Sequence, residues 1–351
     1  MLNKRMPARG GQGRKTWLAF HRWLGLIVGL CLTIIGATGS ILMFKPEIEV
    51  AGLSRFTGPA NLDLIEGGLS EQFPGSRLTW FYEHRNGGLW QARLITNDGR
   101  ESELITSPTG EVLRRQERGH ALDTILTIHS TLMMGTIGYA VTCVIALVTI
   151  FSVVSGLYLW WPVSGRFSKA LRFAPKPPSK RFFFELHRGV GLYASVLVFL
   201  AALSSHTFLI PELLEHYGGI DVADQALLEV ENPDPGAGRP SLSVLAWAAA
   251  QAVPDGRMDF IDLSRIPDEP IVVSMLVDGP SRPRVRVEID QRTGAILRLS
   301  DDRTRPAWQL LITSWAFDFH KGDFFGLPGR LVQASAGLAL SLLAASGLAL
   351  W

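Results

Sequence analysis

Residues 129–160 read HSTLMMGTIGYAVTCVIALVTIFSVVSGLYLW, and residues 320–351 read HKGDFFGLPGRLVQASAGLALSLLAASGLALW. Both stretches begin with His-x5-Gly-x2-Gly and end with Ser-Gly-Leu-x-Leu-Trp, and the gaps between these motifs are identical. A shorter pair lies upstream of each stretch, FHRWLGL at residues 20–26 and LHRGVGL at residues 186–192. The chain is therefore duplicated, and each half places histidines next to apolar segments.

Composition indicates a membrane protein. Hydrophobic residues make up 47% of the chain, and they cluster. A stretch of about 20 apolar residues in a helix crosses about 30 Å of hydrocarbon, and four stretches reach this length. They cover residues 17–44, 139–161, 186–210 and 331–351. The first is no signal peptide, because Phe44-Lys45-Pro46-Glu47 follows it in place of a cleavage site of small residues.

The distribution of cations predicts the topology. Residues 1–22 carry six cations and no acid, and residues 166–181 carry six more. Because such segments stay on the cytoplasmic side, we expect a multi-pass membrane protein with both termini in the cytoplasm. The net charge of +2 gives no indication of a nucleic-acid partner, and membrane lipid is the expected surrounding. Cys31 and Cys143 fall inside the expected spans, so they build no outer disulfide or thiolate metal site.

The two long segments between the spans predict two small α+β periplasmic modules. Expected strands cover residues 88–96, 101–107 and 111–114 in the first, and 258–263, 271–277 and 285–289 in the second, after a short helix at 242–252. The phrases at 109–114 (TGEVLR) and 293–298 (TGAILR) match as hairpin ends. The expected organisation is 1–15 basic N-terminus, 16–44 span, 45–128 module, 129–161 span with lead-in, 162–185 basic loop, 186–210 span, 211–319 module and 320–351 span with lead-in.

The duplication predicts a cofactor site on a symmetry axis. Both halves enter the membrane from the same side, so an axis along the membrane normal relates them. Such an axis would bring His21 to His187 and His129 to His320. A porphyrin is itself nearly two-fold symmetric and takes axial imidazoles on both faces of its iron. We therefore expect two haem b groups with these four histidines as ligands.

Other interpretations of these residues stay open. Gly25 and Gly29 follow His21 at helical spacing and leave room for a flat ring, but small residues at this spacing also pack helices together. His129 and His320 are either iron ligands or anchors at a junction between module and membrane. His206, where the first half has Ser40, is either an alternative outer ligand or a polar residue at a helix end.

The cations Arg22, Arg188 and Lys321, which follow three of the histidines, suit haem propionates and lipid headgroups equally. Aromatic residues near the expected outer end of the fourth span suit a ligand contact or a membrane-interface belt. They are Trp308, Trp315, Phe317, Phe319, Phe324 and Phe325.

These motifs together resemble the PepSY-associated transmembrane proteins. The resemblance rests on His-Arg-x-x-Gly-Leu at residues 21–26, on the His-x5-Gly-x2-Gly lead-in, on Ser-Gly-Leu-x-Leu-Trp-Trp-Pro at 155–162 and on Thr-Gly-Glu-Val-Leu at 109–113. It covers nearly the whole chain. No Trp-Pro follows Trp351, which leaves open whether further residues follow. The family comprises iron-regulated inner-membrane proteins of Gram-negative bacteria, some of which are haem-containing siderophore reductases.

The resemblance implies an oxidoreductase that passes electrons outward, from a cytoplasmic reductase or quinol, to ferric iron in a siderophore complex. Reduction would release iron because oxygen-rich chelators hold the ferric ion far better than the ferrous ion. Two other classes remain. A haem-free binding or inhibitory protein would be colourless, and a siderophore or iron transporter would move its cargo without a reductant.

Overall fold

A computed structural model describes residues 10–84, 88–162, 165, 167–172, 180–208, 240–263, 269–278 and 283–351. The chain divides into two compact units. The helical unit comprises residues 1–44, 124–217 and 312–351, and the sheet unit comprises residues 45–123 and 218–311. The expected end of the third span at 209–210, part of the basic loop and the beginning of the second module at 211–239 lie outside the described residues.

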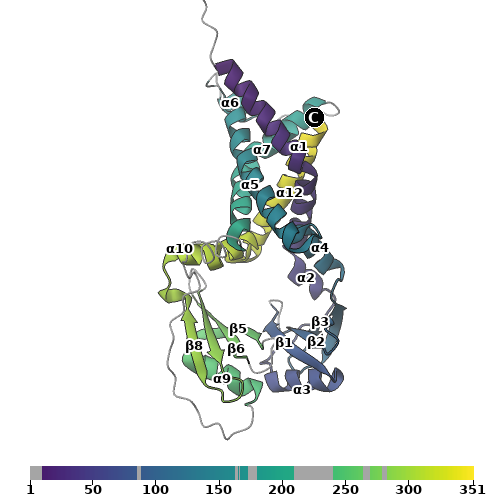
Figure 1. Ribbon diagram of the computed structural model, residues 1–351, viewed down its shortest axis with the longest axis vertical. Coiled ribbons are helices and arrows are strands. Elements are labelled where there is room, and N and C mark those ends of the chain that lie inside the picture. Colours follow the sequence, from purple (N-terminus) through teal and green to yellow (C-terminus); the bar gives the residue numbers. More distant parts are fainter. Residues whose placement is uncertain are drawn as a thin grey trace, which may run out of the picture. The chain divides into compact units, whose positions relative to one another are not determined.

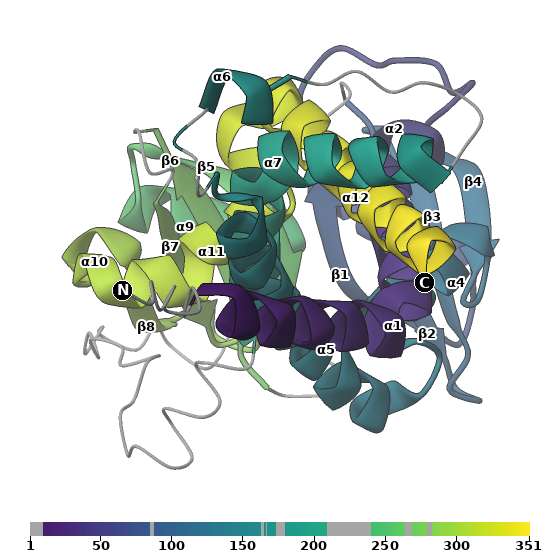
Figure 2. The same cartoon turned by 90° about the horizontal axis from the view of Figure 1, so that it is seen from above.

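Four helices of the helical unit are long and apolar enough to cross a membrane, as the sequence predicts. They are α1 (Gly10–Leu42), α5 (Gly135–Trp160), α7 (Lys180–Ser204) and α12 (Gly326–Leu350). Both α1 and α7 pack against α5 and α12, so α1 and α7 lie diagonally opposite in the bundle (Figure 2). The remaining elements of this unit are short: α4 (Ala121–Thr131), α6 (Phe167–Ala170), η1 (Ser205–Phe208), α11 (Ala316–His320) and η4 (Asp323–Phe325).

The helices α1 and α12 cross at small residues. A side chain at Gly36 would collide with the carbonyl oxygen of Gly337, and a side chain at Gly337 would collide with Ser40. Two serines then donate hydrogen bonds across the crossing, Ser40 to the carbonyl of Ala334 at 2.9 Å and Ser341 to that of Thr33 at 2.9 Å. Small residues allow the two backbones to approach this closely, which is how helices associate in the absence of water.

The sheet unit contains one sheet of eight antiparallel strands in the order β4-β3-β2-β1-β5-β6-β7-β8. The two expected modules thus join, because β1 pairs with β5 through Trp80 opposite Asp262 and Phe81 opposite Ile261. Both joining strands carry a bulge, at residues 78–80 and at residues 258–260. The strands are β1 (Ser76–Glu83), β2 (Trp90–Thr96), β3 (Glu101–Thr106), β4 (Val112–Glu117), β5 (Gly256–Asp262), β6 (Ile271–Val277), β7 (Arg284–Ile289) and β8 (Ile296–Asp301).

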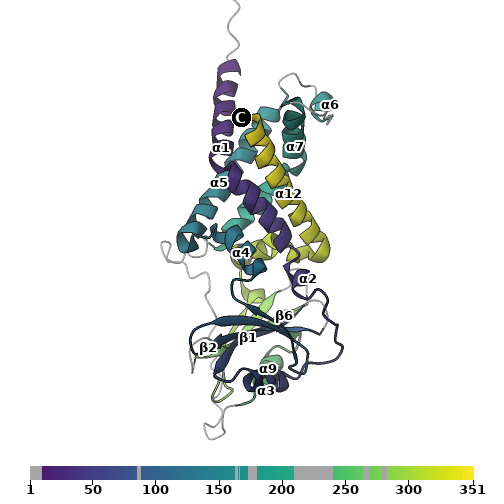
Figure 3. The same cartoon turned by 90° about the vertical axis from the view of Figure 1, so that its right-hand side faces the viewer.

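One face of this sheet packs against α3 (Leu62–Gln72) and α9 (Leu242–Ala252), which lie side by side (Figure 3). Phe81, Ile65 and Ile261 are fully buried between the helices and this face. The sheet unit also contains α2 (Lys45–Glu49), η2 (Asp302–Thr304) and α10 (Ala307–Leu310) (Figure 1), and η3 (Leu311–Trp315) begins in it.

The expected strands and the helix at 242–252 correspond to β2 to β7 and α9, whereas α3, β1 and β8 were not predicted. Glycines obscure α3, because Gly67 and Gly68 are poor helix formers. In the fold Gly68 lies against the backbone of Gly110, with 3.4 Å between a Cβ placed there and the Gly110 carbonyl oxygen. Tertiary packing therefore outweighs local propensity in α3.

Candidate functional site

The structure brings four of the predicted histidines together as two pairs inside the helical unit. In the first pair, the ring centres of His21 and His187 lie 6.1 Å apart with their planes at 74°. In the second pair, the ring centres of His129 and His320 lie 6.3 Å apart with their planes at 40°. The first pair comes from the long helices α1 and α7, and the second comes from the short helices α4 and α11.

Every histidine of the two pairs is held through its Nδ1 atom by a neighbouring helix. His187 Nδ1 lies 2.9 Å from the Leu343 carbonyl, and His129 Nδ1 lies 2.9 Å from the Ile35 carbonyl. A carbonyl oxygen can only accept, so Nδ1 carries the proton and the Nε2 atom keeps its lone pair. The remaining Nδ1 contacts are His21 to Ser155 Oγ at 2.9 Å, His187 to Ser346 Oγ at 3.2 Å, His129 to Thr38 Oγ1 at 3.3 Å, and His320 to Ser204 Oγ at 3.1 Å and to the Ala201 carbonyl at 3.2 Å.

The Nδ1 contacts occur at equivalent positions in the two halves of the repeat. Ser155 and Ser346 are the serines of the two Ser-Gly-Leu motifs, and they hold the equivalent histidines His21 and His187. Sequence reasoning quoted both serines as part of the repeat but gave them no role at the site. Thr38 and Ser204 were likewise missed, although they occupy equivalent places on α1 and α7.

Glycines make room for three of the four rings. A Cβ at Gly156 would lie 3.2 Å from His21 Cε1, and a Cβ at Gly347 would lie 3.3 Å from His187 Cε1. A Cβ at Gly39 would lie only 2.7 Å from His129 Cε1. In contrast, nothing lies within 4 Å of a Cβ placed at Gly25, one turn after His21. Gly25 thus leaves open space, whereas a Cβ at Gly29 would lie 3.0 Å from Leu348 Cγ, so Gly29 packs α1 against α12.

The two glycines of the His-x5-Gly-x2-Gly motif turn the chain between the histidine and the spanning helix. Gly135 and Gly326 are left-handed, with φ of 57° and 62°. A Cβ at Gly138 would collide with the Thr131 carbonyl, and one at Gly329 would collide with the Gly322 carbonyl. The motif therefore folds α4 and α11 back, so that each histidine reaches the bundle. Pro328 lies in the first turn of α12, where a missing N–H is tolerated.

A family model described as the PepSY-associated TM region matches residues 18–351, which is nearly the whole chain. The chain belongs to the PepSY-associated transmembrane family. A search of curated proteins found no match. The family match therefore supports the membrane architecture of this PepSY-associated protein, while its chemistry has to be argued from its own residues.

Both pairs have the dimensions of two imidazoles on one metal ion. A histidine nitrogen binds such an ion at about 2 Å, and the ring centre lies about 1.1 Å further back, so rings on opposite sides have centres about 6 Å apart. The observed values of 6.1 Å and 6.3 Å fit this spacing. Among the described residues, no group of three or more His, Cys, Asp or Glu side chains could hold a metal ion. Each pair by itself would offer a metal ion two imidazoles.

His206 belongs to neither pair. Its Nδ1 lies 3.0 Å from the Ala202 carbonyl, and its Nε2 lies 3.2 Å from the Cys143 carbonyl. The repeat relates these carbonyls to those of Gly36 and Ala334, which Ser40 contacts at 2.9 Å each. His206 therefore takes the place of Ser40 as a bridge between helices, here between α7 and α5. The geometry favours the second of its two sequence interpretations, a polar residue at a helix end.

The three cations that follow histidines have protein partners. The Arg22 guanidinium lies 4.5 Å from the ring centre of Trp351, and Arg188 pairs with Glu185 at 2.7 Å. Lys321 pairs with Asp323 at 3.2 Å. These contacts account for all three residues within the chain.

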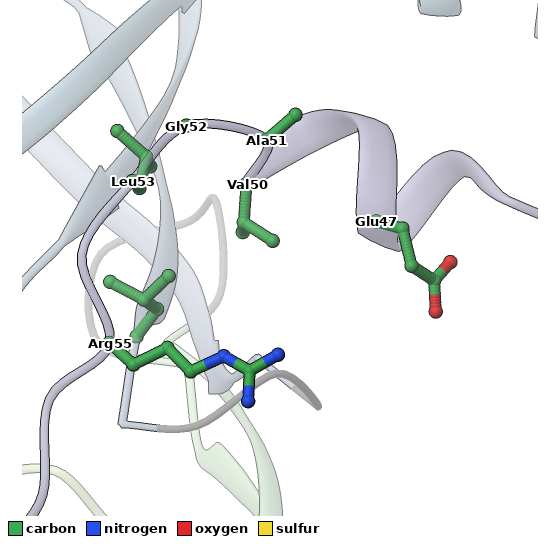
Figure 4. Close-up of a pocket in the computed structure, with 7 residues that line it drawn as sticks. Glu47, Val50, Ala51, Gly52, Leu53 and Arg55 are labelled. Atoms are coloured by element: carbon green, nitrogen blue, oxygen red, sulfur yellow. The ribbon is translucent and has the colours of Figure 1, made fainter.

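The sheet unit contains a small cavity of about 260 Å³ around residues 47–55 (Figure 4). Arg55 and Glu47 are its charged residues, and the Glu47 carboxylate points away from Arg55 (Figure 4). Its lining has no histidine or cysteine, so it offers no imidazole or thiolate ligand. We assign no function to this cavity.

Proposed function

We propose that this PepSY-associated protein binds two haem b groups, one at each histidine pair, and passes electrons across the inner membrane to ferric siderophores. The observation that carries the proposal is the spacing of the paired rings, 6.1 Å and 6.3 Å, combined with Nδ1 contacts on all four histidines. Bound haem would supply an iron that accepts and releases one electron at a time.

The chain's own contribution begins with orientation. Metal-binding histidines usually donate their second N–H to a carbonyl or hydroxyl, which fixes the tautomer and the angle of the ring. The backbone carbonyls of Leu343 and Ile35 do this for His187 and His129. Backbone carbonyls in a helix are held in place, so the two rings are already oriented before a metal binds. Binding through Nε2 then costs little conformational entropy.

The positions of the pairs along the helices support transfer across a membrane. The first pair includes His21 on α1, and the second pair contacts α1 at Ile35, fourteen residues later. At 1.5 Å per residue this separation is about 21 Å, most of the thickness of a hydrocarbon core. On α7 the distance from His187 to Ala201 is again fourteen residues. The two pairs would therefore lie near opposite membrane surfaces.

Direction and substrate follow from the charge pattern and the family. The basic segments at residues 1–22 and 166–181 favour the cytoplasm for the end with the first pair. A cytoplasmic reductase or quinol would then donate electrons at that end, and the ferric siderophore would accept them at the other. The second pair needs no nucleophile or acid–base group for this reaction, because outer-sphere reduction of a chelated ferric ion breaks no covalent bond.

The deciding experiment counts haem per chain in the full-length protein purified in detergent. The wild type should contain about two b-type haems per chain, and alanine at His21, His187, His129 or His320 should remove about one. His206→Ser is the matched control, because His206 lies in the same bundle but bridges two carbonyls. Dithionite-reduced protein should then be reoxidised by a ferric siderophore under anaerobic conditions.

Full haem content in both the His21 and His187 variants would defeat the axial-pair assignment. A colourless wild type, with haem supplied during expression, would instead favour a haem-free binding protein. Siderophore uptake into liposomes without any reductant would favour a transporter.

A further inference from the structure

We propose that the sheet face not covered by α3 and α9 binds a planar aromatic anion. This inference rests on the proposed function for its natural ligand, a ferric siderophore of the catecholate class. The face contains three aromatic rings at the join between the two halves of the sheet, with an arginine on each side. The residues that carry the inference are Trp80, Tyr82, Phe260, Arg93 and Arg286.

The three aromatic rings form a platform where β1 meets β5. The ring centres of Trp80 and Tyr82 lie 5.4 Å apart, and those of Trp80 and Phe260 lie 6.0 Å apart. Tyr82 and Phe260 complete the triangle at 6.2 Å, and the angles between the three planes are 24° to 36°. All three side chains are partly exposed, whereas Phe81 between them points to the other face and is fully buried.

Strand register places Arg286 in line with this platform. Arg286 on β7 is opposite Ser274 on β6, and Ser274 is opposite Phe260 on β5. Residues directly opposite each other in an antiparallel sheet share a face, so Arg286 lies two strands, or about 10 Å, from Phe260 on the same face. The residue between them, Ser274, has a short side chain and is buried.

Four arginines on and beside this face have carboxylate partners within the chain, and one further carboxylate, Asp262, lies opposite Trp80. Arg93 contacts Glu103 at 2.6 Å, and its guanidinium stacks 4.7 Å from the Trp80 ring centre. The carboxylate partners of three further arginines are Asp259 for Arg284 at 3.2 Å, Glu288 for Arg298 at 3.8 Å and Asp302 for Arg305 at 3.7 Å. The backbone of Arg286 pairs within the sheet, but its guanidinium makes no hydrogen bond or ion pair with any residue that the structure describes.

The surroundings of Arg286 favour an added anion. Burial, together with the charges of Arg305 and Arg284, lowers the pKa of the Arg286 guanidinium, and the charge of Asp302 opposes this. Asp302 is already engaged, because it accepts the backbone N–H of Arg284 at 3.2 Å and pairs with Arg305. An anion that reached Arg286 would therefore gain a charge-assisted hydrogen bond that no carboxylate of the described chain provides.

The aromatic rings and Arg286 together favour one class of ligand. Near-parallel aromatic rings favour a flat ring that stacks or meets them edge-on, and the spare arginine favours negative charge about 10 Å away. A tris-catecholate complex of a trivalent metal carries flat rings and a net charge of −3. A neutral hydroxamate complex has neither feature, so it should bind this face poorly.

The test is equilibrium binding of the gallium(III) complex of a tris-catecholate chelator to the full-length protein in detergent. Gallium is redox-inert, so binding is measured without any electron transfer. Arg286→Gln should weaken binding at least about tenfold, because a charge-assisted hydrogen bond is lost. Arg286→Lys should retain part of it, and Phe260→Leu should also weaken binding. Trp247→Ala is the matched control, because Trp247 is an exposed aromatic on α9, on the helix-covered side.

Three results would overturn the inference. They are no binding to the wild type, unchanged affinity in both Arg286→Gln and Phe260→Leu, or equally tight binding of a gallium hydroxamate. Haem content is read on the same samples. Haem without gallium-complex binding defeats this inference alone, and binding without haem defeats the proposed electron transfer alone.

Discussion

The crossing of α1 with α12 and the crossing of α7 with α5 are related by the repeat, but their contacts differ. The first is built on Gly36, Gly337 and Ser40, and the second has Ala202, Ala146 and His206 at the equivalent positions. The paired histidines next to these crossings, and the hydroxyl groups on their Nδ1 atoms, occupy equivalent positions in both halves. The duplicated protein thus preserved its candidate ligands more strictly than its helix packing.

This difference explains why His206 misleads a reading of the sequence. A histidine inside a membrane segment is costly and is by default a functional candidate. Here it contacts the carbonyls of Ala202 and Cys143, which are the counterparts of those contacted by Ser40. The helices it joins carry alanines where the other crossing has glycines, so the larger ring bridges a wider gap.

The largest effect is expected at the tighter crossing. Gly36→Leu should destabilise the bundle by about 3 kcal/mol, because any side chain there meets the Gly337 backbone. Thermal unfolding in detergent measures the change. Gly13→Leu on the same helix is the control, because nothing lies within 4 Å of a Cβ there. Equal stability of the two variants would contradict a close approach of α1 and α12 at Gly36.

Exchanging the two bridging residues tests the comparison directly. Ser40→His should destabilise the bundle by about 2 kcal/mol, because the added ring has no room beside Gly337. His206→Ser should cost about 1 kcal/mol for one weakened bridge. Unfolding curves of the two single variants measure both changes. A greater loss of stability in His206→Ser than in Ser40→His would contradict the conclusion that α1 and α12 cross more closely than α7 and α5.

A smaller and more local effect is expected at the second histidine pair. Gly39→Ala should weaken haem binding there about tenfold, because the new methyl group would lie 2.7 Å from His129 Cε1 and displace the ring. The equivalent residue in the second half, Ser205, already has a Cβ. Ser205→Ala should therefore leave haem content unchanged. Equal loss of haem in both variants, measured by titration of haem-depleted protein, would contradict the role given to Gly39.

The smallest effect concerns the sheet unit, where the two helices begin differently. The helix α3 is capped by Asn61, the residue directly before it. The helix α9 is capped by Asp63 of α3, whose carboxylate accepts hydrogen bonds from Ser243 N at 2.8 Å and from Ser241 Oγ at 3.0 Å. Burial opposes ionisation of Asp63, but these hydrogen bonds outweigh it and lower its pKa. Asp63→Ala should cost about 1 kcal/mol, as loss of a helix cap does.

The pH dependence of this cap has a definite sign. Since the folded pKa of Asp63 is depressed, its stabilisation is complete above the unfolded pKa of about 3.9 and is lost as pH falls through the folded value. Asp98, which the Thr96 hydroxyl and Arg100 contact, behaves alike with a pKa of about 2. Acid unfolding of wild type and Asp63→Ala should therefore converge below pH 4. A constant difference across the acid range would rule out the charged cap.

The sequence by itself determined the four spans, the duplication and the two histidine pairs. Spans are readable because about 20 consecutive apolar residues have few alternatives to a membrane helix, and the pairs are readable because repeat symmetry requires like residues to meet. The strands β2 to β7 were predictable from alternation and turn signals. The central strand β1 was not, because Trp80, Phe81 and Tyr82 form an unbroken aromatic run that serves both faces of the sheet.

Only the tertiary structure decided which atoms hold the histidines, what His206 does and how the outer modules combine. Ile35, Leu343 and Ala201 contribute backbone carbonyls to the pairs, and carbonyls leave no trace in side-chain identity. His206 could be assigned only after its two partner carbonyls were located on α7 and α5. The single eight-stranded sheet arises because β1 and β5 are each an edge of a half-sheet, and unpaired strand edges gain hydrogen bonds by joining.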